Sequence, residues 1–180
     1  NYSISSDAGG TPITASGVAI SSATQTLTNI DVTSLPDGTL TISLTLTDTA
    51  GNVSSAVIDT ITKEAIAPTV DSVTIATGNY KQGDSIDVTV TLSEDVTVSG
   101  TSSTLAIDVG GTARLATFVW ETNGVLIYRY SVQAGENDSD GITASTNGIT
   151  TNGDTFLDGG SNGASLTYSG VINTNALVDN

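Results

Sequence analysis

The sequence predicts an all-β protein that consists of two antiparallel β-sandwiches in tandem. Apolar and hydroxyl residues alternate strictly in Thr39–Thr47 (TLTISLTLT), which places leucine and isoleucine on one face of a strand and threonine on the other. No stretch carries the i, i+3, i+4 apolar stripe of a helix, and β-branched residues dominate throughout. Glycine, asparagine, aspartate and proline separate the alternating runs at short intervals, as in Thr122–Gly124.

A domain boundary is predicted near Lys63–Pro68, where the alternation stops, charged residues cluster and a proline precedes a new alternating run. We therefore expect domain one over residues 1–66 and domain two over residues 67–180. Domain two has enough runs for a complete seven-strand sandwich. In sandwich order, strands A, B, C, C′, E, F and G are expected at 69–76, 85–92, 104–109, 112–120, 125–133, 141–150 and 165–173.

Domain one supplies only five runs. They correspond to strands C, C′, E, F and G, at 2–6, 11–20, 23–32, 38–48 and 53–62. We expect this domain to lack its A and B strands, which would leave an unpaired sheet edge and part of the core uncovered. Three explanations stand side by side: the sequence begins within a domain, a neighbouring chain completes it, or residues 1–66 close a smaller fold.

The composition excludes several kinds of chemistry. The 180 residues contain no histidine and no cysteine, which excludes a Ser-His-Asp triad, a thiolate nucleophile, disulfides and the usual zinc sites. A metal site must then use oxygen ligands, which suit calcium or magnesium. The formal net charge of −15 argues against nucleic acid, and no apolar run is long enough for membrane insertion.

An internal repeat supports the tandem arrangement. Asp48–Asn52 (DTAGN) has the spacing of Asp158–Asn162 (DGGSN), and the segments VIDT and VINT follow the two copies. Each copy then leads to an acidic residue, Glu64 in the first and Asp179 in the second.

Several segments resemble the immunoglobulin-like repeats of very large bacterial secreted adhesins of the calcium-dependent, RTX type. In domain one these are residues 31–52 (DVTSLPDGTLTISLTLTDTAGN) and 67–69 (APT); in domain two they are 80–85, 92–98 and 132–142. The resemblance implies immunoglobulin-like or fibronectin-III-like sandwiches on the extracellular bacterial cell surface. It further implies calcium-stiffened stalk modules with neighbouring repeats of the same chain as partners, a role in cell adhesion or biofilm attachment, and a host or surface ligand at the stalk's tip.

The sandwich topology predicts a calcium site at the end of domain two where strand A enters. The B–C and F–G loops meet at that end, beside the segment that arrives from domain one. Clustered carboxylates repel one another unless a cation neutralises them, and calcium accepts six to eight oxygens in flexible geometry. The candidate ligands are Glu94, Asp95, Asp154, Asp158, Asn162, Asp59 and Glu64. The alternative is that these residues only cap turns.

Two further acidic loops are candidates. Asp48 and Asn52 form the equivalent loop of domain one, with a tight turn at a positive-φ Gly51 as the alternative. Acids at Glu136, Asp138 and Asp140, followed by glycine, resemble the start of an EF-hand loop. The twelfth position of that loop is Asn147 and no helices flank it, so an EF-hand is not expected. A calcium-binding E–F loop that includes Asp84 is expected instead, with a solvated acidic turn as the alternative.

We expect no enzymatic activity, because Asp138 and Asp140 form an i, i+2 pair without an evident pocket or an apolar surrounding. The expected function is a calcium-stiffened extender of a surface adhesin. One alternative is a recognition module for glycan or peptide; an exposed Trp120 beside a concave cluster of loops favours recognition, and a buried Trp120 favours the spacer. Another is a structural surface-fibre subunit completed by a neighbouring chain. Tyr128 and Tyr130 belong either to the same sugar-binding surface or to the core.

Overall fold

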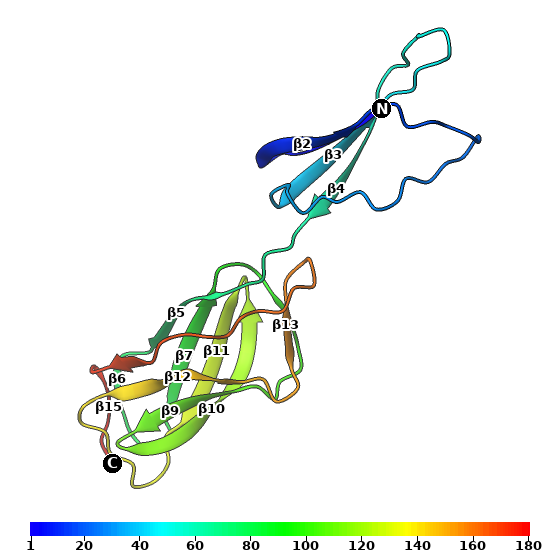
Figure 1. The fold of residues 1–180 in the computed structure, drawn as a ribbon. Helices are drawn as coiled ribbons and strands as arrows, with labels where there is room; N and C mark the ends of the chain where they lie inside the picture. The colour runs from blue at the N-terminus through cyan, green and yellow to red at the C-terminus, as the bar shows by residue number, and fades with distance from the viewer. The chain divides into compact units, whose positions relative to one another are not determined.

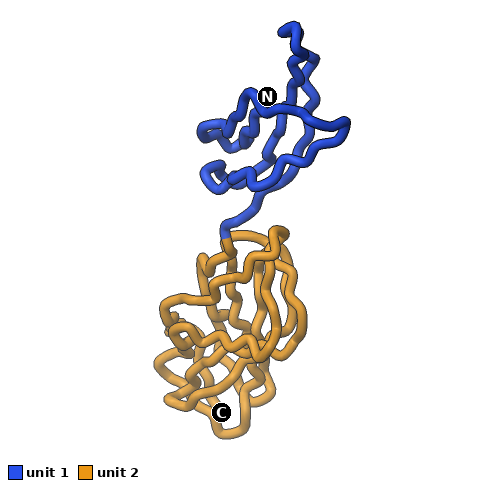
Figure 2. Tube along the Cα trace, turned by 45° about the vertical axis from the view of Figure 1, so that its right-hand side comes forward, with its two compact units in different colours: residues 1–66 blue, residues 67–180 orange.

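The computed structural model describes all 180 residues, and its regular structure consists of strands alone. The chain divides into two compact units, Asn1–Ile66 (unit 1) and Ala67–Asn180 (unit 2), at the position expected from the sequence (Figures 1 and 2). None of its elements is a helix long and apolar enough to cross a lipid bilayer. All-β architecture with antiparallel sheets is thus the fold class of this chain.

Unit 1 is a single antiparallel sheet in the order β2-β1-β3-β4. Its strands are β1 (Tyr2–Ser6), β2 (Gly9–Ala15), β3 (Gly38–Leu44) and β4 (Val57–Lys63). In β3 the alternation predicted from sequence places leucine and isoleucine on one face of the sheet and threonine and serine on the other. The fully buried apolar residues of the unit are only Ile4, Leu35 and Leu40.

The strand expected at 23–32 is wrong: these residues lie in irregular structure between β2 and β3. A strand is stable only when its N–H and C=O groups pair with a neighbour, and Asn29 adopts φ 59°, which interrupts an extended backbone. The segment instead lays Ile30, Val32 and Leu35 on the apolar face of the sheet. Unit 1 therefore has one sheet whose apolar face is covered by a loop, where a sandwich has a second sheet.

Unit 2 contains a seven-stranded sheet in the order β14-β12-β9-β10-β11-β7-β5, together with two short two-stranded pairs, β13–β8 and β15–β6. The strands are β5 (Val70–Ile75), β6 (Gly78–Tyr80), β7 (Ser85–Leu92), β8 (Thr97–Ser99), β9 (Thr104–Val109), β10 (Thr112–Thr122), β11 (Val125–Ser131), β12 (Ile142–Thr150), β13 (Thr155–Leu157), β14 (Val171–Asn173) and β15 (Ala176–Val178). The seven predicted runs correspond to the seven strands of the large sheet, although the last one is much shorter than expected.

The large sheet curls into a sandwich, because β14 and β5, at opposite ends of the strand order, contact each other (Figure 1). Alternate residues of β7, such as Ile86, Val88 and Val90, are fully buried inside. Phe118 packs edge-to-face on Tyr128, with ring centroids 5.7 Å apart, and Phe156 also packs against Phe118. These residues belong to one continuous core that holds the loops at both ends of the unit.

Candidate functional site

The N-terminal end of unit 2 brings two loops beside its first residues. The amide of Ser93 donates to the carbonyl of Thr69 (2.8 Å), which holds the loop after β7. The amide of Ser165 donates to the carbonyl of Pro68 (2.7 Å), which holds the segment after the 158–162 loop. The structure therefore positions these two loops at the end of the sandwich that the sequence predicted.

Glu94 and Asp158 are the acidic pair that these loops bring together. One carboxylate oxygen from each lies within 4.8 Å of the other, and Asp158 is only 6% exposed. Two oxygens that bind one calcium ion at 2.3–2.6 Å lie at most about 5 Å apart, so this separation fits a shared ion. Both ligands are carboxylate oxygens, the donor type that suits calcium, magnesium and manganese.

The Asp158–Asn162 loop is closed by its two end residues. The Asp158 carboxylate accepts hydrogen bonds from the Asn162 amide (2.8 Å) and from the Asn162 side-chain nitrogen (2.9 Å). The Asp158 amide donates to the Asn162 carbonyl (3.1 Å). A carboxylate has about four lone-pair positions, so accepting these bonds is compatible with metal ligation.

The Asp48–Asn52 loop of unit 1 repeats this pattern bond for bond. Its carboxylate accepts from the Asn52 amide (2.9 Å) and side chain (2.8 Å), and the Asp48 amide donates to the Asn52 carbonyl (3.0 Å). The fourth residue has positive φ in both copies, 90° at Gly51 and 67° at Ser161. The bonds from Asn52 lower the pKa of Asp48 more than burial raises it. The repeat seen in the sequence is thus one structural unit present twice.

Two other predicted ligands in unit 2 accept hydrogen bonds from the backbone of neighbouring loops. Asp154 is 8% exposed and accepts from the amides of Ser102 and Ser103, both at 2.6 Å. Asp95 accepts from the Gly124 amide at 3.1 Å. These bonds make Asp154 and Asp95 anchors for backbone that the sheet leaves unpaired. Calcium ligation by either residue stays a prediction.

The two predicted ligands from unit 1, Asp59 and Glu64, occupy different places in that unit. Asp59 lies in the middle of β4, opposite Ile42, and lines a groove on the apolar face of the sheet. Glu64 follows the last residue of β4 in the chain. A role for either residue in a metal site of unit 2 stays a prediction.

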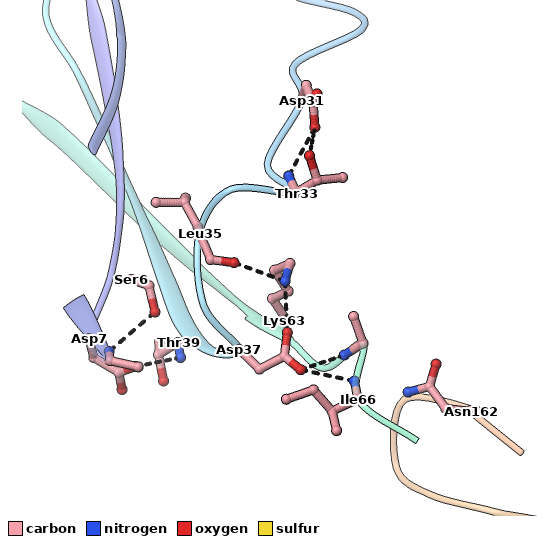
Figure 3. A network of polar contacts seen from close by, with 12 residues as sticks. Ser6, Asp7, Asp31, Thr33, Leu35, Asp37, Thr39, Lys63, Ile66 and Asn162 are labelled. Carbon is pink, nitrogen blue, oxygen red and sulfur yellow. Dashed lines mark hydrogen bonds and ion pairs between the residues drawn. The ribbon is translucent and has the colours of Figure 1, made fainter. Parts of the chain in front are cut away.

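Asp37, which the sequence patterns did not mark as a functional residue, organises the end of unit 1 (Figure 3). Its Oδ1 accepts from Lys63 Nζ (2.7 Å), and its Oδ2 accepts from the amides of Ala65 (2.8 Å) and Ile66 (3.0 Å). The Lys63 bond and then the Ala65 amide lower the pKa of this carboxyl. Lys63 also donates to the Leu35 carbonyl (3.0 Å), so the residues that lead to unit 2 are tied to the β3 turn.

Glu136, in the predicted E–F loop, is 7% exposed and fully engaged by protein donors. Its carboxylate accepts from Arg114 Nε, from the Tyr130 hydroxyl (2.6 Å) and from the Gln133 amide (2.8 Å). Burial raises the Glu136 pKa, but the bonds from Tyr130 and Arg114 outweigh it, so the pKa lies below its ordinary value. Burial, with Glu136 as the next cause, raises the pKa of Tyr130 to about 12.

Asp138 is buried even more deeply, at 3% exposure, and its carboxylate connects its own loop to the turn at Gly110. It accepts from the amides of Gly141 (2.7 Å), Gly110 (2.8 Å) and Asp140 (3.2 Å). Asp140 itself is exposed. Calcium binding here stays a prediction.

Asp84 lies near this loop, as expected, because its carbonyl accepts from the Val132 amide (2.9 Å). Its carboxylate accepts from the Lys81 amide at 3.0 Å. Arg114, which no sequence motif marked as functional, lies on β10 and donates to Glu136, 22 residues further along the chain. The antiparallel topology brings the two together.

The three aromatic residues singled out in the sequence divide between core and surface. Tyr128 is fully buried, with its hydroxyl 2.9 Å from Ser103 Oγ, and burial raises its pKa to about 12. Tyr130 is 7% exposed, whereas Trp120 is 46% exposed, opposite Ile127 on the neighbouring strand. The tyrosines are therefore core residues and the tryptophan is available at the surface.

No protein-family model matches this chain, and no curated protein shows significant similarity to it.

Proposed function

We propose that this chain forms extender modules of a bacterial cell-surface adhesin, and that calcium stiffens them. The modules hold an adhesive region away from the cell and so contribute to cell adhesion or biofilm attachment. The observation that carries the proposal is the Glu94–Asp158 carboxylate pair, within 4.8 Å, at the end of unit 2 where the chain enters. The resemblance to extracellular immunoglobulin-like repeats and the duplicated Asp–Asn loop support it.

Glu94 and Asp158 are the residues that would hold the ion. Two carboxylates at this separation repel each other in its absence, and a chain with a net charge of −15 offers few cations to relieve that repulsion. Bound calcium supplies the neutralising charge and additional coordination positions for backbone carbonyls. The Asp158–Asn162 loop, already closed by its own hydrogen bonds, loses little further conformational entropy on binding.

The role is mechanical and non-catalytic. An ion that binds only the folded protein stabilises it by RT ln(1 + [Ca²⁺]/Kd). With Kd of about 10⁻⁴–10⁻³ M, typical of extracellular modules, 1 mM calcium contributes about 0.4–1.4 kcal/mol. Such weak sites fill outside the cell, where calcium is plentiful, so the modules stiffen where they act.

Calcium titration of the wild-type chain and a Glu94→Gln/Asp158→Asn double variant tests this proposal. We expect 1 mM calcium to raise the wild-type melting temperature by about 2–8 °C and leave the double variant unchanged. Asp71→Asn, at an exposed acidic position of unit 2 that is not a candidate ligand, is the matched control and keeps the wild-type response. An unchanged wild-type melting temperature, or an equal rise in the double variant, contradicts calcium binding at this pair.

The Glu64 prediction has its own experiment. Small-angle scattering of the wild-type chain is expected to show a narrower distribution of particle dimensions with calcium than with EDTA. Glu64→Gln is expected to reduce that difference while unit 2 still binds calcium through Glu94 and Asp158. Identical profiles with calcium and EDTA in the wild type contradict stiffening.

A recognition module is the second candidate, and the 46% exposure of Trp120 favours it. Leu115 and Val119 on the same strand are also exposed, at 58% and 39%. Tryptophan faces stack well on sugar rings and on peptide side chains. Titration with soluble chitin and dextran oligosaccharides is expected to change the emission of this single tryptophan if the surface binds sugar, and Trp120→Ala removes the binding.

A further inference from the structure

Strand β4 forms one edge of the unit 1 sheet, because it pairs with β3 alone (Figure 1). Its aliphatic side chains are unusually exposed for a strand: Ile61 is 70%, Val57 69% and Ile58 63% exposed. An edge strand offers unpaired N–H and C=O groups to a further strand, and natural proteins usually protect such edges with charge, proline or a bulge. β4 contains two charged residues, Asp59 and Lys63, but no proline and no bulge, and its ladder with β3 is continuous from Val57 to Lys63.

The residues of β4 alternate between the two faces of the sheet. Asp59, Ile61 and Lys63 lie on the apolar face, since their partners on β3 are Ile42, Leu40 and Gly38. Asp59 and Ile61 line a groove there together with residues of β1 and β3. The order Asp59, Ile61, Lys63 therefore presents a negative, an apolar and a positive side chain in succession along one face of an open edge.

We propose that β4 pairs antiparallel with β4 of a second copy of this chain, about a two-fold axis at Ile61. In this register Ile61 faces Ile61 of the second copy. Asp59 of each chain faces Lys63 of the other. Direct cross-strand pairs of opposite charge and of aliphatic residues are both favourable, so the edge is complementary to itself.

Lys63 can serve this pairing without leaving its partners in unit 1. Its ammonium group has three donors, of which Asp37 takes one (2.7 Å) and the Leu35 carbonyl another (3.0 Å). Asp59 is engaged only locally, since its carboxylate accepts from the adjacent Thr60 amide (2.9 Å).

One adjacent symmetric register, about Thr60, is less favourable. It places Asp59 opposite Ile61 and Lys63 opposite Val57, so that each charge faces an aliphatic side chain. Charge complementarity therefore selects the Ile61-centred register. The proposal is independent of calcium binding in unit 2, because none of its residues belongs to the Glu94–Asp158 site.

Cysteine cross-linking tests both the pairing and its register, because the natural chain contains no cysteine. Directly opposed residues of antiparallel strands have Cα atoms about 4.5–5.5 Å apart, within the range of a disulfide. Under mild oxidation at 150 mM NaCl, Ile61→Cys is expected to form a covalent dimer much faster than Thr60→Cys or the remote control Ile172→Cys. Faster cross-linking of Thr60→Cys overturns the register, and equal slow cross-linking of all three variants overturns the pairing.

Solution mass provides the second measurement. Sedimentation equilibrium of the wild-type chain is expected to show reversible association from the 18.1 kDa monomer to a dimer as concentration rises. Ile61→Lys places like charge at the centre of the axis and is expected to abolish association. Ile172→Lys, at a 55% exposed position of β14, is the matched control and leaves it intact. A wild-type chain that stays monomeric at millimolar concentration, or an Ile61→Lys variant that still dimerises, overturns the proposal.

Discussion

Removal of the Asp138 carboxylate is expected to destabilise unit 2 more than loss of any exposed acidic residue. The Asp138→Ala variant leaves the Gly141 amide, which is buried, and the Gly110 amide, which is partly buried, without their acceptor. An unsatisfied buried donor costs about 1–3 kcal/mol, and water can reach the Gly110 amide in part, so we expect a total loss of about 2–4 kcal/mol. Native domains have only about 5–15 kcal/mol of stability, so this is a large fraction.

Urea unfolding followed by tryptophan emission measures this loss directly. Trp120 is the single tryptophan of the chain and lies in unit 2, so its signal reports that unit. Asp140→Ala removes an exposed carboxylate two residues away and is expected to change the unfolding free energy by less than about 0.5 kcal/mol. Both variants are compared with the wild type in EDTA and in 1 mM calcium.

The loss of stability in Asp138→Ala is expected to be independent of calcium, because the three hydrogen bonds that the Asp138 carboxylate accepts come from backbone amides. An Asp138→Ala variant as stable as Asp140→Ala would refute this explanation. A loss of stability that appears only in calcium and disappears in EDTA would also contradict this explanation, because a bound cation would then stabilise the E–F loop.

Two further predictions concern the same end of unit 2. In urea unfolding, Gly110→Ala is expected to lower the free energy of unfolding clearly more than Gly111→Ala does. Both glycines have positive φ (58° and 79°), but a Cβ at Gly110 meets the carbonyl oxygen of Asn137, whereas a Cβ at Gly111 meets no atom. Equal losses of stability in the two variants contradict the clash. Because the folded pKa of Glu136 lies below its unfolded value, its contribution to stability is present above the unfolded pKa, about 4.5, and is lost as pH falls through the folded pKa. Acid titration of unfolding is therefore expected to be steeper below pH 4.5 in the wild type than in Glu136→Gln, and identical curves would show that the carboxylate's protonation is not linked to folding.

The strands of unit 2 could be predicted because each long strand has one face in the core. That condition imposes a period of two on the sequence, as in β7, where Ile86, Val88 and Val90 alternate with polar residues. The Asn123–Gly124 pair, with φ of 49° and 74°, likewise marks the hairpin between β10 and β11. The short strands β6, β8, β13 and β15 have three residues each, too few to show a period.

The strand expected at 23–32 illustrates what alternation cannot predict. Its pattern of threonine and aliphatic residues is compatible with a strand, but a strand also requires a partner, and this segment pairs with none of the four strands of the sheet. The apolar residues Ile30 and Val32 of this segment nevertheless pack against the sheet.

For the candidate ligands, too, the sequence predicts some features and only the tertiary structure shows the others. Their acidic character and the position of their loops follow from the sequence, but the donors that reach each carboxylate do not. Glu136 is bound by Arg114, and Asp154 by the amides of Ser102 and Ser103, residues that are 22 and about 50 positions away in the chain. Only Glu94 and Asp158 emerge as a pair within unit 2 that faces a common position.

The sequence by itself determined the all-β class, the strands of the seven-stranded sheet of unit 2, the repeated Asp–Asn loop and the restriction to oxygen ligands, because these depend on local periodicity, turn chemistry and composition. Tertiary structure alone decided which acids hold the fold together and which could hold an ion, and which strand of unit 1 is left as an open edge. The physical reason is that a carboxylate's role depends on its surrounding donors and solvent, and an edge depends on which strands find partners. Both are set by residues distant in the chain.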